Sequence, residues 1–172
     1  MTSADVLVDA FDRIRGTVHQ VVDGLGPDQL AFRVEREANT IAWLVWHLTR
    51  VQDDHVSEPA RTEQVWTSQG WVERFGLSLP PADTGFGHSS DDVAALRDIP
   101  AETLAGYHDA VHERTKHFVE RLTDTDLARI VDASWDPPVS LGVRLVSVIS
   151  DGLQHAGQAA FVRGVVQRAH RL

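Results

Sequence analysis

The sequence contains no cysteine, and this absence excludes several kinds of chemistry. Disulfides, thiolate zinc fingers and a thiol nucleophile belonging to the chain itself cannot occur. Other side chains must therefore carry any chemistry, and the 9 histidines and 25 acidic residues are the available candidates.

Positive charge is also scarce. The 172 residues carry 16 basic and 25 acidic side chains, a formal net charge of −9, and Lys116 is the single lysine. Nucleic-acid binding needs clustered lysine and arginine to neutralise phosphates, and no such cluster is present. We therefore expect no nucleic-acid partner. The excess of arginine over lysine is typical of a GC-rich bacterial genome.

Long apolar runs are missing as well. The sequence has no basic-then-apolar segment at its beginning and no apolar run long enough to span a bilayer. We expect a soluble, cytoplasmic protein without a membrane partner. The length suits a single domain over residues 1–172, which can bury a core without disulfides.

Four segments have the apolar periodicity of long helices: residues 3–22, 39–59 with Asn39 as the expected N-cap, 100–122 and 140–168. The last segment is apolar on nearly all sides, which predicts a central helix. The connection over residues 59–99 is long enough to hold short helices, for which residues 62–75 are the best candidates. This pattern predicts an all-α four-helix bundle with one long crossover.

The fourth predicted helix places a carboxylate in an apolar setting. Asp151 is costly there unless it is paired or bound to a cation. His155 follows four residues later, so the two side chains share one face at a spacing that suits two ligands of one metal. His47, beside the apolar stripe of the second predicted helix, should face the same seam. A buried ion pair of Asp151 with His155, Arg50 or Arg144 is an equally good interpretation.

The other histidines give weaker patterns. His108 and His112 also have the i, i+4 spacing, but their charged neighbours indicate a solvated face. His88 follows two glycines in a loop and is expected to be exposed. No pairing pattern is found for three others, His19, His117 and His170.

Two motifs resemble a known family. The segment NTIAWLVWHLTRVQDDH (residues 39–55) and the segment SDGLQHAGQ (residues 150–158) are similar to the DinB/YfiT-like superfamily, in the branch that includes mycothiol-dependent maleylpyruvate isomerase. The resemblance covers essentially the whole chain and implies an up-down-down-up bundle. It also implies a divalent metal held by His47, Asp151 and His155. Zinc is the first choice, and nickel, iron and manganese remain open.

The same resemblance implies thiol transfer or thiol-assisted isomerisation, with a low-molecular-weight thiol such as mycothiol as cosubstrate and a small electrophile as substrate. Gln158 is then expected to orient a ligand. Arg50 and Asp54 are expected to contact the cosubstrate or to pair with each other. One alternative is a non-catalytic, metal-binding, stress-associated protein. Another is a structural homodimer, which predicts a buried Asp151–arginine pair and no open cavity beside it.

Overall fold

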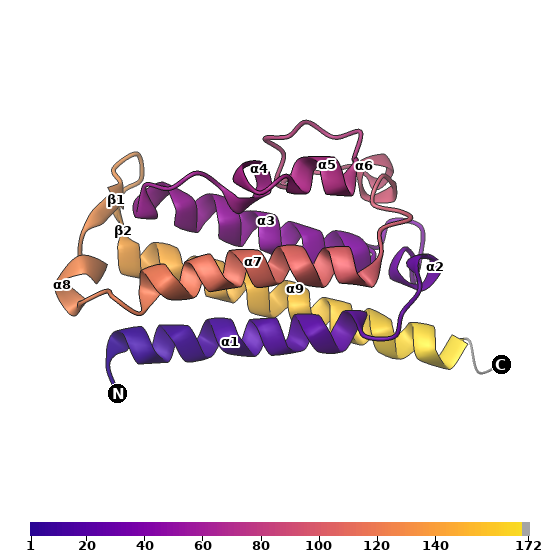
Figure 1. The fold of residues 1–172 in the computed structure, drawn as a ribbon, viewed down its shortest axis with the longest axis horizontal. Helices are drawn as coiled ribbons and strands as arrows, with labels where there is room; N and C mark the ends of the chain where they lie inside the picture. The colour runs from indigo at the N-terminus through magenta and orange to yellow at the C-terminus, as the bar shows by residue number, and fades with distance from the viewer. Residues whose placement is uncertain (170–172) are drawn as a thin grey trace.

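The computed structural model describes residues 1–169, and four long helices form most of it: α1 (Ser3–Val22), α3 (Ile41–Ala60), α7 (Ala101–Val119) and α9 (Leu141–Ala169). Helices α1 and α9 run in one direction, and α3 and α7 run in the other (Figure 1). Helices α3 and α1 each pack against both α7 and α9. The fold is therefore the expected all-α bundle with up-down-down-up topology.

Local sequence signals explain where these helices begin. Thr2 caps α1 in a reciprocal capping box with Asp5, so two free backbone N–H groups gain acceptors. The N-cap of α3 is Thr40, whose hydroxyl accepts from the Trp43 N–H at 3.0 Å. The prediction of Asn39 as the cap was wrong by one residue. Either side chain can act as an acceptor at this position.

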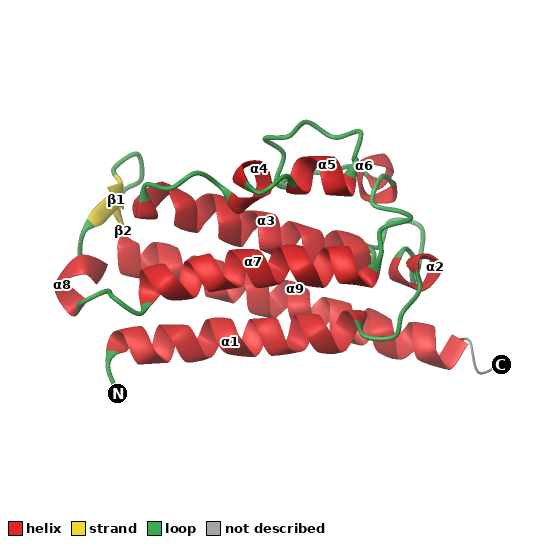
Figure 2. Cartoon of the chain, in the orientation of Figure 1, coloured by secondary structure: helices red, strands yellow, loops and turns green. Residues whose placement is uncertain are grey.

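The crossover between α3 and α7 contains three short helices, α4 (Val65–Ser68), α5 (Trp71–Phe75) and α6 (Ser90–Ala94). The first two coincide with the segment predicted to contain them. Figure 2 shows this connection lying along one side of the bundle. Two further short helices, α2 (Pro27–Leu30) and α8 (Asp124–Leu127), and an antiparallel pair of strands, β1 (Ile130–Asp132) and β2 (Val139–Ser140), lie at the ends of the long helices.

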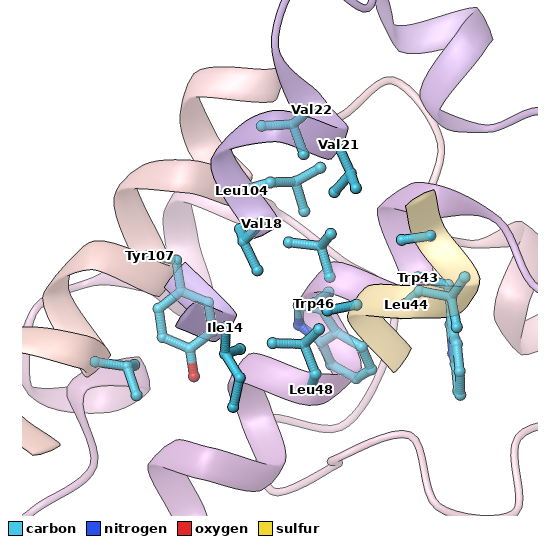
Figure 3. Close-up of a cluster of buried hydrophobic side chains, with 14 of the residues drawn as sticks. Ile14, Val18, Val21, Val22, Trp43, Leu44, Trp46, Leu48, Leu104 and Tyr107 are labelled. Carbon is cyan, nitrogen blue, oxygen red and sulfur yellow. The ribbon is translucent and has the colours of Figure 1, made fainter. Parts of the chain in front are cut away.

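Apolar side chains from the long helices meet in one buried cluster, part of which Figure 3 shows. Ile14 and Val18 of α1 lie with Trp46 of α3 and Tyr107 of α7 in this region. Full burial of each large apolar side chain contributes about 1.5–3 kcal/mol to stability. The 3.6-residue spacing seen in the sequence therefore corresponds to the faces that the bundle buries.

Helix α9 differs from its prediction. It buries one face, but several large apolar side chains on its other face are exposed: Val143 (55 %), Val146 (60 %), Leu153 (47 %) and Phe161 (66 %). Each helix of a four-helix bundle has an outward face, and α9 packs mainly against α1 and α3. The helix is therefore not central. Within the described residues, no helix is long and apolar enough to cross a membrane.

The prediction of a solvated face for His108 and His112 was wrong, since both are buried, at 0 % and 2 % exposure. His108 Nδ1 lies 3.0 Å from the Thr49 hydroxyl of α3, and His112 Nε2 lies 2.9 Å from Asp12 of α1. The charged neighbours on α7 that suggested solvent contact include Asp109, which pairs with α1 instead. Both imidazoles consequently point into the bundle.

Candidate metal centre

Helices α3 and α9 bring three side chains together in the seam between them. His47, Asp151 and His155 each offer a ligand atom, and these atoms lie within 4.8 Å of one another. The ring centroids of the two histidines are 4.8 Å apart, and His155 Nε2 lies 3.4 Å from Asp151 Oδ1. These are the three residues that the motifs indicated, and the described part of the chain contains no other group of three His or acidic residues with this geometry.

Hydrogen bonds fix the tautomers of both imidazoles. His47 Nδ1 donates to the carbonyl of Thr84, and His155 Nδ1 donates to Gln158 Oε1 at 2.8 Å. A carbonyl or amide oxygen can only accept, so each Nδ1 carries the proton and each Nε2 of the neutral ring keeps a lone pair. This is the arrangement that metal-binding histidines usually have. Gln158, which was expected to orient a ligand, contacts the imidazole of His155.

Asp151 supplies a second observation that fits a cation. Its Oδ2 atom is buried and has no hydrogen-bond partner. An unsatisfied buried carboxylate oxygen is costly, and a bound cation would remove that cost. The donor set of two imidazoles and one carboxylate suits zinc and other divalent first-row metals, and leaves coordination positions open.

The arginines that could have neutralised Asp151 have other partners. Arg50 Nη1 lies 3.8 Å from Asp53, and Arg144 lies 3.2 Å from Glu58 and 3.5 Å from Asp132. Among the residues that the structure describes, Asp151 has no arginine partner; its ion-pair partner is His155 at 3.4 Å, which is one of the pairings that the sequence left open. The buried Asp151–arginine pair that the structural-dimer hypothesis predicted is not formed.

The two histidines differ in their pKa. Burial lowers the pKa of His47, although its bond to Thr84 acts in the opposite direction. The protonated ring of His155 donates from Nε2 to Asp151, and this hydrogen bond raises the pKa of His155, so a metal at this nitrogen competes with a proton. His47 is therefore neutral at pH 7, which is the form that binds a metal.

Residues 83–88 of the crossover form a loop that lies against His47. Gly85 has φ +94°, and a Cβ atom there would lie 2.7 Å from His47 Nδ1 and within 3.2 Å of both Trp43 and Trp46. Only glycine combines this backbone conformation with such a close approach. The glycine lets the Thr84 carbonyl reach the imidazole.

His88 belongs to the same loop and is not exposed as predicted, because its side chain is only 6 % accessible. Its Nδ1 accepts from the Trp43 indole N–H at 3.0 Å, and its Nε2 lies 2.9 Å from Asp83 Oδ2. Trp43 in turn stacks on His47, with ring centroids 4.5 Å apart and planes at 15°. The loop thus supports the candidate ligand through both its backbone and an aromatic side chain.

Arg50 and Asp54 do not pair with each other. Arg50 is fully buried and donates to the Asp83 carbonyl at 3.0 Å and to Gln64 Oε1 at 2.8 Å. Gln64 also donates to Asp54 Oδ1 at 2.7 Å, so the amide lies between them. Both residues hold the crossover against α3, and the buried Arg50 offers no surface to a cosubstrate in this structure.

Two pockets flank the triad along α9. The first, here called the Trp135 pocket, has a volume of about 330 Å³ and includes His55, Asp132, Trp135, Arg144, Ser147 and Asp151. The second, the Phe161 pocket, has a volume of about 540 Å³ and includes Glu37, Asn39, Leu44, Gln158 and Phe161. Both volumes lie in the range of small-molecule sites. Open space beside Asp151 also disagrees with the structural-dimer hypothesis.

A four-helix bundle of this topology, with two histidines and a carboxylate in the seam of α3 and α9, defines a DinB-like protein. The sequence matches the mycothiol-S-transferase family over residues 6–167. The chain belongs to this family.

The structural comparison agrees with this assignment. A crystal structure of a conserved protein from Enterococcus faecalis is similar, with a TM-score of 0.90 and 27 % sequence identity over 96 % of this chain and 98 % of that chain. No protein with a curated description matches the sequence.

Proposed function

We propose that this protein is a metal-dependent S-transferase that joins mycothiol to a small electrophile such as a xenobiotic or a reactive metabolite. Membership of the mycothiol-S-transferase family supports the thiol part of the proposal. The absence of cysteine is consistent with it, because the sulfur must then arrive on a cosubstrate. In the overall reaction, the S–H bond breaks and a carbon–sulfur bond forms as the electrophile's double bond or carbon–leaving-group bond breaks. The proton ends on the adduct or on the displaced leaving group.

The metal dependence in this proposal rests on the protonation and burial of the three candidate ligands. Both histidines donate from Nδ1, so Nε2 of each neutral ring can bind a metal, which at His155 would replace the proton that pairs this nitrogen with Asp151. Asp151 Oδ2 is buried without a partner. A divalent ion bound there would lower the pKa of a thiol and stabilise the thiolate. We propose zinc, with nickel, iron and manganese as the other candidates to test.

The protein's own groups then have defined tasks. The Thr84 carbonyl and Gln158 hold the two imidazoles, and Trp43 restrains the plane of the His47 ring. The pockets on either side of the triad provide separate places for the two reactants. An oriented pair of reactants lowers the entropic part of the barrier.

Elemental analysis and turnover assays test this proposal together. Purified wild-type protein should retain one divalent ion per chain, and His47→Ala, Asp151→Asn and His155→Ala should each lose most of it. His117→Ala is the matched control, because His117 is on the surface of α7 with its side chain 68 % exposed. The metal-loaded protein should consume mycothiol with at least one member of a panel of electrophiles.

Two results would contradict the proposal in different ways. Metal retained unchanged in His47→Ala would show that the triad is not the metal site. Stoichiometric metal without turnover of any thiol would instead favour the non-catalytic metal-binding alternative.

A further inference from the structure

The Trp135 pocket is lined by an indole ring that remains exposed to solvent in the folded chain. Trp135 lies in the turn between β1 and β2 and is 66 % exposed, whereas the other four tryptophans are buried. Folding gains free energy when it buries an aromatic ring. An exposed indole that lines a pocket is therefore available for contact with a ligand.

The polar groups around the indole are already held in position. Asp132 Oδ1 accepts from the Ser134 N–H at 2.9 Å and from its hydroxyl at 2.6 Å. Asp132 Oδ2 lies 3.5 Å from Arg144, which also bonds to Glu58 at 3.2 Å. Groups that are fixed before binding lose little entropy when a ligand arrives.

The charges of this pocket indicate what kind of ligand it can take. Arg144 is the one arginine or lysine among the described residues that line it, and Glu58 and Asp132 already neutralise its charge. Asp151 adds one more negative charge, and with a divalent ion at the triad these charges sum to zero. A phosphate or carboxylate would therefore meet no excess positive charge, and its desolvation would not be compensated.

An uncharged ring with many hydroxyl groups fits better. Hydroxyls can donate to the carboxylates of Asp132 and Asp151 and accept from Arg144. The flat C–H face of a sugar or cyclitol ring can lie against the Trp135 indole, which offers a rigid apolar surface. The pocket thus combines the two kinds of surface that such a ring presents.

Asp151 connects this pocket to the candidate metal centre, because it belongs to the pocket wall and to the triad. A group attached to a ring in the pocket therefore lies beside the centre. We infer that the Trp135 pocket binds the uncharged, hydroxyl-rich ring part of the thiol cosubstrate, an inference that rests on the proposed function. Mycothiol has such a part in its acylated glucosamine–inositol unit, whereas glutathione carries carboxylates.

Calorimetric titration with N-acetylglucosaminyl-inositol, the thiol-free part of mycothiol, tests this inference without turnover. The wild-type protein should bind this fragment, and Trp135→Ala should weaken its binding about three- to tenfold. Phe161→Ala is the matched control, because Phe161 is an equally exposed aromatic residue in the other pocket. It should bind the fragment as the wild type does. Glutathione should bind more weakly than mycothiol.

The outcomes separate this inference from the proposed function. Fragment binding that depends on Trp135, in a protein that turns over no thiol, would refute the transferase proposal and leave the ring site supported. Turnover of mycothiol with a KM raised in Trp135→Ala and an unchanged kcat would support both. The inference is overturned if the wild type does not bind the fragment, or if Trp135→Ala and Phe161→Ala bind it equally well.

Discussion

Burial of His108 should make the protein less stable in mild acid. The Thr49 hydroxyl donates to the Val45 carbonyl at 2.7 Å, so it must accept from His108 Nδ1. A second proton could therefore enter only at Nε2, which is buried without a partner. Burial, with repulsion from His112, lowers the pKa of His108 to about 3.

The remaining charged groups around His108 act against one another. Asp109 raises the pKa, while His19 and Arg15 of α1 lower it. The sign of the effect on stability follows from the lowered pKa. Above pH 6.5 the ring is neutral in both the folded and the unfolded chain, and the contribution to stability is fully present. As the pH falls from 6.5 towards 3, the unfolded chain binds a proton that the folded chain excludes, so stability is lost.

The expected loss of unfolding free energy is about 2 kcal/mol at pH 5 and about 4 kcal/mol at pH 3, from 1.36 kcal/mol per pH unit. Burial also lowers the pKa of His112, so this neighbour acts in the same direction. Urea unfolding at pH 7.5 and pH 5 measures the effect in the wild type, in His108→Asn and in His117→Asn. Asparagine keeps a donor for Thr49 but does not titrate, and His117 is an exposed histidine on the same helix.

The wild type and His117→Asn should lose about 2 kcal/mol more between the two pH values than His108→Asn does. The comparison uses the change with pH, so a general destabilisation by the substitution does not affect it. The reasoning is refuted if all three proteins lose the same stability, or if NMR titration finds an ordinary pKa for His108.

Three further perturbations test other parts of the structure. Gly85→Ala should displace the 83–88 loop from His47 and weaken zinc binding, which titration with zinc measures. Gly87→Ala is the control, because its φ is +75° but nothing lies within 4 Å of a new Cβ. It should cost only about 1–3 kcal/mol of stability, which thermal melts measure. Asp53→Asn should lower the unfolding free energy by about 3 kcal/mol, because this buried carboxylate accepts from two backbone N–H groups and from the hydroxyl of Tyr107; chemical denaturation measures the loss, and a value below about 1 kcal/mol would contradict this account. Removal of metal by a chelator should abolish turnover, and zinc should restore it; turnover unchanged after verified metal removal would contradict metal dependence.

Local periodicity was sufficient to predict the four long helices and the long crossover, whereas the up-down-down-up topology was predicted from the family resemblance. The spacing of Ile14 and Val18 on α1, for example, matches the face that the bundle buries. The triad could also be predicted, because Asp151 and His155 are four residues apart on one helix and the motif around His47 has a recognisable family pattern.

Features that depend on the partner of a helix could not be predicted in this way. Asp109 suggested a solvated face on α7, but it lies 2.7 Å from Arg15 and 2.8 Å from His19 of α1, and nothing near it in the sequence indicates these partners. The buried position of His88 depends on a loop whose path is set by contacts with α3. The glycines before His88 were the one feature of the sequence that could have indicated its burial, since glycine permits a backbone to approach a helix closely.

More than a hundred residues separate His47 from Asp151, so the unfolded chain does not hold the three candidate ligands together. A cation that binds at the triad therefore binds the folded chain only, and it shifts the folding equilibrium by mass action. At a concentration one hundred times its Kd, the shift is about 2.7 kcal/mol. Melting temperatures measured with different cations would then rank the candidate metals by affinity before any substrate is known.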